Sequence, residues 1–194
     1  MHTFVGILLF GSFAVLPGQT ENTFDAEKIT GTVIEVLQES PREDLFSQEA
    51  VDLLVMTHII ESVIKGKIHK KQTSGGPAQG MFQMEPTTEK DIWEHYLRFP
   101  KNKDLREWVL SYASSQNPQE KNLKGPRDLK HNVRYQIAMA RIYYERRTKI
   151  SVARKKDYVE QLAYLWKNHY NSPLGKGSVE KAIQKYKFYS KELH

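Results

Sequence analysis

The chain has 194 residues, enough for one domain with a substantial core and some accessory sequence. It carries 29 Lys and Arg residues against 23 Asp and Glu residues, and the resulting net charge of +6 draws it to polyanions without choosing among them. The absence of Cys excludes a disulfide scaffold, a Cys nucleophile and a thiolate zinc site.

The first element is an apolar run over residues 4–16, which ends at Pro17-Gly18. It is shorter than the roughly 20 residues that a membrane-spanning helix needs. Its length is typical of a signal-peptide core, but no Lys or Arg precedes it and no good Ala-x-Ala cleavage site follows. Three interpretations stay open: an imperfect signal, a membrane-seeking tip, or a segment buried against a partner.

Residues 20–39 are mostly polar and predict a connector, with one apolar patch at residues 33–37 that could be a strand or a helical turn. Ser40-Pro41-Arg42-Glu43 is typical of a helix start, with a capping Ser and Pro at the first helical position. Apolar side chains then continue to Ile64 around most of the helix, so we expect a central buried helix. Gly66 should end it.

The remainder of the chain predicts further helices and little strand. We expect a loop or small hairpin over residues 65–80, a helix capped by Thr87 or Thr88, and a long mobile loop over residues 114–131. Further helices are predicted at residues 105–112, 135–146, 158–170 and 178–189. The fold class is therefore mainly α.

Glu61 is the first candidate for chemistry, because it lies near the end of the apolar helix. Burial disfavours a charged carboxylate, so such a Glu can keep its proton near neutral pH and donate it to a leaving oxygen. A plain surface glutamate at a helix end is the alternative. The glycine-rich segment at residues 75–80 permits close approach of backbone to a ligand, and Gln83 offers both a donor and an acceptor to a sugar.

Residues 58–62 followed by residues 75–86 resemble the SLT-type lytic transglycosylases of the lysozyme superfamily. The motif of that family reads roughly Glu-Ser, a variable gap, then Gly-Ala-x-Gly-Leu-Met-Gln-Ile-x-Pro. Glu61-Ser62 and residues 78–86 fit it, with Pro77 in place of its first Gly. Tyr170-Asn171, followed by Gly175, is similar to the late Tyr-Asn pair of these enzymes at a longer spacing. The segment at residues 170–177 resembles transglycosylase-like virion proteins of bacteriophages more than it resembles the bacterial housekeeping enzymes.

The resemblance implies a lysozyme-like domain over residues 40–194, with minimal β structure, behind a hydrophobic N-terminal accessory segment at residues 1–39. It implies cleavage of the β-1,4 bond between N-acetylmuramic acid and N-acetylglucosamine, with Glu61 as acid and then as base for the 6-hydroxyl of the sugar. By the same resemblance the substrate is bound by Ser62, Gln83, Glu85, Tyr170 and Asn171. No cofactor or metal is expected.

The position of a second carboxylate leaves the reaction type open. No Asp lies between Glu61 and Glu85, which favours a mechanism with a single acid. Glu85 is the only nearby candidate for a second role; it could orient a sugar or a water, or cap a helix ahead of Pro86. A hydrolytic lysozyme is therefore one alternative, and a structural virion protein that kept the fold without the activity is another.

The expected partner is the peptidoglycan glycan strand. The resemblance also implies that the protein belongs to a virion and acts in the host cell envelope during genome delivery. A periplasmic or secreted enzyme is the alternative, and residues 1–20 could contact other virion proteins or a membrane. The basic run at residues 65–71 should lie beside the cleft, where it could attract anionic wall polymer or a nucleic-acid backbone. The lack of interleaved aromatic residues disfavours nucleic acid.

Overall fold

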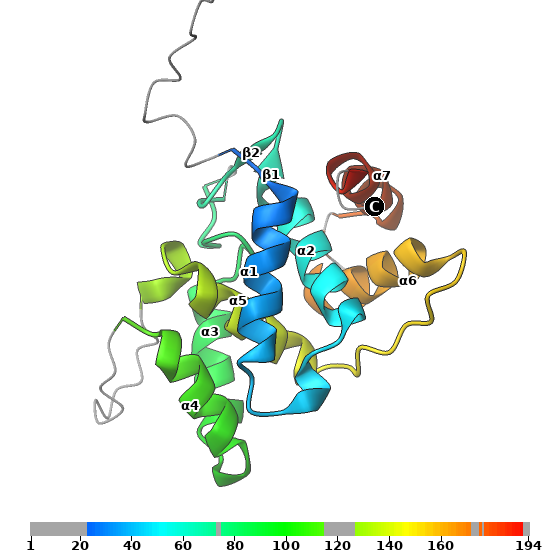
Figure 1. Cartoon of the computed structure of the whole chain (residues 1–194). Helices are drawn as coiled ribbons and strands as arrows, with labels where there is room; N and C mark the ends of the chain where they lie inside the picture. Colours follow the sequence, from blue (N-terminus) through cyan, green and yellow to red (C-terminus); the bar gives the residue numbers. More distant parts are fainter. Residues whose placement is uncertain (1–22, 73–74, 115–126, 172–174, 176, 192–194) are drawn as a thin grey trace, which may run out of the picture.

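The computed structural model describes residues 23–72, 75–114, 127–171, 175 and 177–191, and this part of the protein is mainly helical (Figure 1). Its α-helices are α1 (Ala26–Gln38), α2 (Gln48–Ser62), α3 (Pro86–Ile92), α4 (Lys103–Tyr112), α5 (Val133–Glu145), α6 (Tyr158–Leu165) and α7 (Val179–Tyr189). Strands β1 (Val63–Ile64) and β2 (Lys67–Ile68) form one antiparallel pair. Short 3-10 turns are Glu43–Leu45, Pro100–Asn102 and Arg127–Lys130, and π-helical turns are Trp93–Leu97 and Trp166–Asn171. The prediction of a mainly α fold with little strand is confirmed.

Two sequence features fall partly or wholly outside these residues. The apolar run at residues 4–16 and most of the loop expected at residues 114–131 are not among them, and the described end of that loop forms the turn Arg127–Lys130. None of the helices in the described ranges combines the length and apolar character that crossing a membrane requires.

Helix α2 is the centre of the core, as its composition predicted. Every residue from Val51 to Ile59 is buried, and the helix packs against α1, α5, α6 and α7. Figure 1 shows α2 running beside α1, with α6 and α7 on its other side. A helix that is apolar around its circumference has to be enclosed on all sides, and here four neighbours enclose it.

The predicted start of α2 at Ser40 is wrong. The helix begins after Ser47, whose hydroxyl accepts a hydrogen bond from the backbone N–H of Ala50 at 3.1 Å. The guanidinium of Arg42 instead donates to Asp44 and to Glu145 on α5, both at 2.7 Å. Two capping serines compete in the sequence, and the tertiary ion pairs of Arg42 favour the second one.

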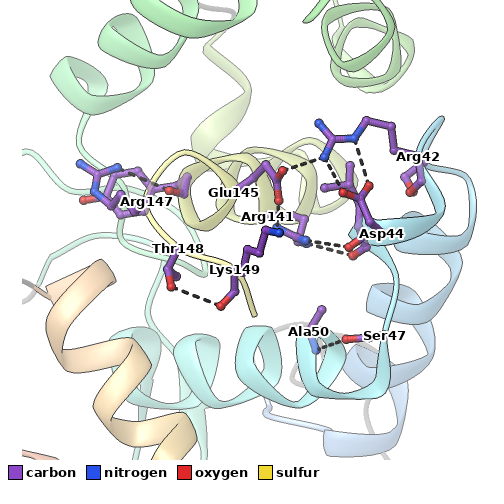
Figure 2. A network of polar contacts seen from close by, with 12 residues as sticks. Arg42, Asp44, Ser47, Ala50, Arg141, Glu145, Arg147, Thr148 and Lys149 are labelled. Carbon is purple, nitrogen blue, oxygen red and sulfur yellow. Dashed lines mark hydrogen bonds and ion pairs between the residues drawn. The ribbon is translucent and has the colours of Figure 1, made fainter. Parts of the chain in front are cut away.

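A buried arginine on helix α5 also contacts the turn before α2 (Figure 2). The guanidinium of Arg141 donates to the carbonyl of Leu45 at 2.9 Å and to Glu145 at 3.1 Å. A buried guanidinium needs such partners, because an unpaired charge in the core is costly. This network fixes the turn before α2 to α5, and thereby the helix that carries Glu61.

The predicted end of α2 at Gly66 is also wrong, because the helix ends at Ser62. The β-branched pair Val63-Ile64 continues as strand β1, which returns through Lys65 and Gly66 to β2. Both turn residues have positive φ, +50° and +72°, as a type I′ hairpin turn requires. The small hairpin considered for residues 65–80 is therefore present, and it starts two residues earlier.

The region predicted as a polar connector contains a full helix, α1. Asp25 caps it by accepting from the N–H of Lys28 at 2.9 Å, and Ile29, Val33 and Val36 are buried in the core. The apolar patch at residues 33–37 is thus the last part of an amphipathic helix that packs on α2 and α5. Residues 26–38 share one core with the rest of the described chain.

The later helices agree with the sequence, apart from one cap. Helix α3 begins at Pro86 after Glu85, and not after Thr87 or Thr88, because Pro is well suited to the first helical position. Helices α4, α5, α6 and α7 lie within two residues of the predicted starts. Ser178 caps α7 by accepting from the N–H of Lys181, as expected.

Candidate active site

A cleft of about 560 Å³ opens at the C-terminal end of α2. Its walls come from the end of α2, the segment after β2, the turn before α3, helix α5 and the π-helical turn after α6. It is lined by Glu61, Ile64, His69, Lys71, Gln72, Ala78, Gln83, Met84, Glu85, Thr88, Tyr143, Tyr170, Asn171 and Gly175. Five of the six residues proposed from the sequence therefore meet in one cleft: Glu61, Gln83, Glu85, Tyr170 and Asn171.

Glu61 is partly buried in this cleft and has two polar neighbours. The indole Nε1–H of Trp166 donates to its Oε1 at 2.8 Å. Burial raises the pKa of Glu61 to about 7, although the Trp166 hydrogen bond and the positive charge of Lys185 both act to lower it. Since an indole N–H can only donate, Oε1 stays an acceptor, and the proton of the neutral acid lies on Oε2.

Lys185 on α7 places its ammonium group beside the end of α2. Its Nζ donates to the carbonyl oxygen of Ile60 at 2.8 Å. Burial lowers the pKa of Lys185 to about 8, and the charge of Glu61 opposes that shift. Glu61 can therefore hold a proton near neutral pH, and the ammonium group of Lys185 lies at the same end of α2.

The wall that carries Gln83 is a tight turn. Gln79 and Met84 exchange two backbone hydrogen bonds of 3.0 and 3.1 Å. Gln83 has a φ of +46°, an uncommon conformation for a residue with a side chain, and its Nε2 donates to the carbonyls of Gly80 at 2.7 Å and His69 at 3.1 Å. With its amide nitrogen held by the protein, Gln83 presents Oε1 as an acceptor for a ligand hydroxyl.

Gly80 lets this turn lie directly against α5. A Cβ at this position would lie 2.0 Å from the carbonyl oxygen of Leu129 and 2.3 Å from Oε1 of Gln136. The next residue, Met81, donates its backbone N–H to the same Gln136 oxygen at 2.6 Å. Met81 and Phe82 are buried, so the turn is both bonded and packed to the core.

Ser62, the sixth proposed residue, does not line the cleft. It is buried, donates to the carbonyl of His58 at 3.1 Å and lies 2.8 Å from Nδ1 of the same imidazole. Nδ1 of His58 is also 3.1 Å from the carbonyl of Met81, which can only accept, so Nδ1 carries the proton. Burial lowers the pKa of His58 to about 4, so the ring is neutral at pH 7. Ser62 and His58 thus fix the turn to α2.

Tyr170 lines the cleft without a hydrogen bond to Glu61. Its hydroxyl donates to the carbonyl of Phe82 at 2.8 Å. The ring packs edge-on against Tyr143 at 5.0 Å and against Tyr144 at 5.4 Å. The aromatic rings of Tyr143 and Tyr170 give the cleft a firm apolar wall.

Asn171 and Glu85 lie at the mouth of the cleft. Oδ1 of Asn171 accepts from Nζ of Lys167 at 3.0 Å. Glu85 is exposed at the N-terminus of α3, where Oγ1 of Thr87 donates to it at 3.3 Å. Glu85 occupies the N-cap position of α3 but its side chain makes no capping hydrogen bond, and it lines the cleft.

Sequence reasoning missed Trp166, Lys185 and Tyr143 as parts of the site. Each comes from an element far along the chain from Glu61, and periodicity alone does not say which side chain will reach it. The position of Lys185 could have been noticed from its spacing on α7. It follows the buried Ala182 by about one helical turn and precedes the buried Tyr186, so it lies next to the buried face of the helix.

In the described ranges, no three carboxylate or imidazole groups come close enough to hold a metal ion. Comparisons with family models, with curated proteins and with solved structures find no match to this chain. The site itself consists of a partly buried acid, an amide acceptor and an aromatic wall around an open cleft.

Proposed function

We propose that the protein is a peptidoglycan-cleaving lytic transglycosylase with a lysozyme-like domain, acting on the bond between N-acetylmuramic acid and N-acetylglucosamine. The observation that carries the proposal is Glu61, whose burial raises its pKa to about 7 at the edge of a cleft of about 560 Å³. A general acid is most useful when its pKa lies near the working pH. The sequence resemblance points to the same residue independently.

In the proposed first step, Oε2 of Glu61 donates its proton to the glycosidic oxygen as the bond to the anomeric carbon breaks. The departing sugar then carries a hydroxyl, and Glu61 is left as a carboxylate. Trp166 and Lys185 stabilise that carboxylate by a hydrogen bond and by charge.

In the second step, the same carboxylate removes the proton from the 6-hydroxyl of the muramic acid residue. The 6-oxygen attacks the anomeric carbon and closes a 1,6-anhydro ring, so no water enters the product. Glu61 recovers its proton, and the site is ready for another turnover. The cycle is balanced with one carboxyl group, without a second acid.

The other residues of the cleft would hold the sugars. Gln83 presents Oε1 to a hydroxyl or an N-acetyl N–H, and the rings of Tyr143 and Tyr170 form a surface on which a pyranose can pack. Asn171 and Glu85 add polar groups at the mouth. Following the resemblance, we place the enzyme in a phage virion that opens the host cell wall locally during genome delivery.

Hydrolysis is the second candidate reaction, because Glu85 lines the same cleft as Glu61. A second carboxylate could activate a water, as it does in ordinary glycosidases. The two reactions give different products: transglycosylation yields muropeptides one water lighter than hydrolysis does.

The test is mass spectrometry of the muropeptides released from purified sacculi by the wild type and by Glu61→Gln. The proposal expects anhydro products from the wild type and none from the variant. Ordinary reducing ends, abolished by Glu85→Gln, would establish the hydrolase instead. No release by a folded wild type would overturn both reactions and favour a structural virion protein.

A further inference from the structure

A second hollow of about 300 Å³ adjoins the cleft, and its walls are basic. It is lined by Ile68, His69, Lys70, Lys71, Lys130 and His131, and no described acidic residue contributes to it. His69 and Lys71 also line the Glu61 cleft, whereas Lys70 lines only the basic hollow. The two hollows therefore lie next to each other, with His69 and Lys71 as shared lining residues.

The backbone that carries these lysines is held in place on both sides. The N–H of His69 donates to the carbonyl of Ser62 at 2.8 Å, and the carbonyl of Lys70 accepts from Gly80 at 2.8 Å. Lys71 pairs with Gln79 across an isolated antiparallel bridge. The backbone of residues 69–71 is therefore already ordered, and binding needs little further ordering of it.

No carboxylate of the described residues neutralises the charge of the hollow. Asp128, two residues before Lys130, is buried, and its carboxylate accepts from the backbone N–H of Ser114 at 2.8 Å and from its hydroxyl at 2.5 Å. The ion pairs formed among the described residues involve neither Lys70, Lys71 nor Lys130. Within the described part of the chain, three ammonium groups and two imidazoles thus line a hollow that no carboxylate neutralises.

We propose that this basic hollow binds the free carboxylates of an acidic peptide attached to the glycan strand, so that peptide-bearing glycan is cleaved in preference to peptide-free glycan. This inference rests on the proposed function. Lysine ammonium groups attract carboxylates as point charges, and Ile68 offers an apolar surface to small aliphatic side chains of the peptide. The connection through His69 and Lys71 suits a substituent that branches from a sugar held at Glu61.

The hollow fits a nucleic-acid backbone less well. Proteins that bind single strands line a basic groove with aromatic side chains on which bases stack, and none of the described residues that line this hollow is Phe, Tyr or Trp. A volume of about 300 Å³ accommodates a few carboxylates with short side chains, whereas a duplex needs a far longer surface.

The test compares glycan strands that carry their peptides with the same strands after the peptides have been removed by an amidase. The full-length wild type is measured beside Lys70→Gln/Lys130→Gln. The control is Lys155→Gln/Lys156→Gln, which removes the same charge at two exposed residues outside both hollows. We expect the first double variant to lose about 10-fold in kcat/KM on peptide-bearing strands, and less than about 2-fold on stripped strands, with the control unchanged.

Each other outcome has one meaning. Equal cleavage of both substrates by the wild type, or an equal loss on both substrates in the double variant, overturns the inference and leaves the proposed function standing. Cleavage of neither substrate by the wild type overturns the proposed function and the inference with it. Salt-dependent binding of duplex DNA that the Lys70→Gln/Lys130→Gln variant loses, with unchanged glycan preference, would make the hollow a polyphosphate site. Activity on stripped strands also reports that the variants are folded.

Discussion

Two glutamates of this protein have nearly the same acidity in very different surroundings. Burial raises the pKa of both Glu61 and Glu89 to about 7. Glu61 lies at the edge of an open cleft, whereas Glu89 on α3 is 5% exposed and accepts a 2.5 Å hydrogen bond from the hydroxyl of Tyr135. Tyr135 in turn accepts from the indole of Trp93 at 3.0 Å, which closes a network within the core.

The difference teaches that a raised pKa alone does not identify a catalytic acid. Both carboxyls can hold a proton at neutral pH, but only Glu61 has a cleft into which that proton can be delivered. The charged neighbours differ as well: Lys185 lowers the pKa of Glu61, while Asp128 raises that of Glu89. Glu61 therefore lies in a cleft beside a positive charge, whereas Glu89 lies in the core near a negative one.

The largest change in stability is expected for a substitution at Gly80, in the turn that forms one wall of the cleft. Gly80→Ala places a Cβ against the carbonyl of Leu129 and forces a side chain onto a φ of +75°, so we expect a loss of about 2–4 kcal/mol in unfolding free energy. Gly31→Ala is the matched control, because its Cβ would meet nothing within 4 Å on helix α1. It should stabilise the protein by about 0.5–1 kcal/mol. Urea denaturation measures both, and equal effects would contradict the packing described for the turn.

The next largest effect is the change in the pH dependence of stability when Glu89 or Glu61 is replaced. The folded-state pKa of Glu89, about 7, lies above its ordinary value of 4.5, so its contribution to stability is complete below pH 4.5 and is lost as the pH rises through 7. Glu89→Gln should therefore match the wild type near pH 4 and exceed it by up to about 3 kcal/mol at pH 8. Glu61→Gln should gain less at pH 8, because it leaves the ammonium of Lys185 without its counter-charge.

Denaturation at a series of pH values measures these curves. A Glu89→Gln curve parallel to that of the wild type between pH 4 and 8 would show that Glu89 is ionised normally, and the comparison would then fail.

Trp166→Phe tests the hydrogen bond that distinguishes the surroundings of Glu61 from those of Glu89. It removes the N–H that donates to Oε1 of Glu61, and we expect about a 10-fold lower rate, equivalent to one hydrogen bond. The pKa of Glu61 should rise further, which moves the alkaline limb of the pH–rate profile to higher pH. Trp108→Phe is the control, because the Trp108 N–H is buried without a partner in the described structure. A profile unmoved in Trp166→Phe would remove Trp166 from the site.

The smallest effect is expected for Lys185→Met. Loss of the ammonium raises the pKa of Glu61, so the alkaline limb should again move to higher pH, with a change in rate of about 3-fold or less at pH 6. Lys187→Met, at an exposed position on the same helix, should leave the profile in place. A shift of the limb to lower pH would contradict the assigned charge.

Much of the helical fold could be predicted because its signals are local. The unbroken apolar run predicts the buried α2, and Ser178 predicts the start of α7. The true ends of α2 could not be predicted, since they depend on the ion pairs of Arg42 with α5 and on the hairpin turn at Lys65 and Gly66.

The candidate site also has parts that could be predicted from the sequence and parts that could not. Five proposed residues share the cleft because they lie at the ends of elements that meet there, while Ser62 faces the core because a one-residue step along a helix turns the side chain by about 100°. The partners of Glu61 could not be predicted, because Trp166 and Lys185 reach it only through the packing of α6 and α7 on α2.

The most direct test measures the release of muropeptides from purified sacculi by the wild type, Glu61→Gln and Glu89→Gln side by side. Both substitutions remove a carboxyl whose pKa is about 7, but only one of them lies in the cleft. The account predicts a loss of about 100- to 10,000-fold for Glu61→Gln and nearly full activity for Glu89→Gln. Activity that survives Glu61→Gln, or that falls equally in both variants, would contradict it.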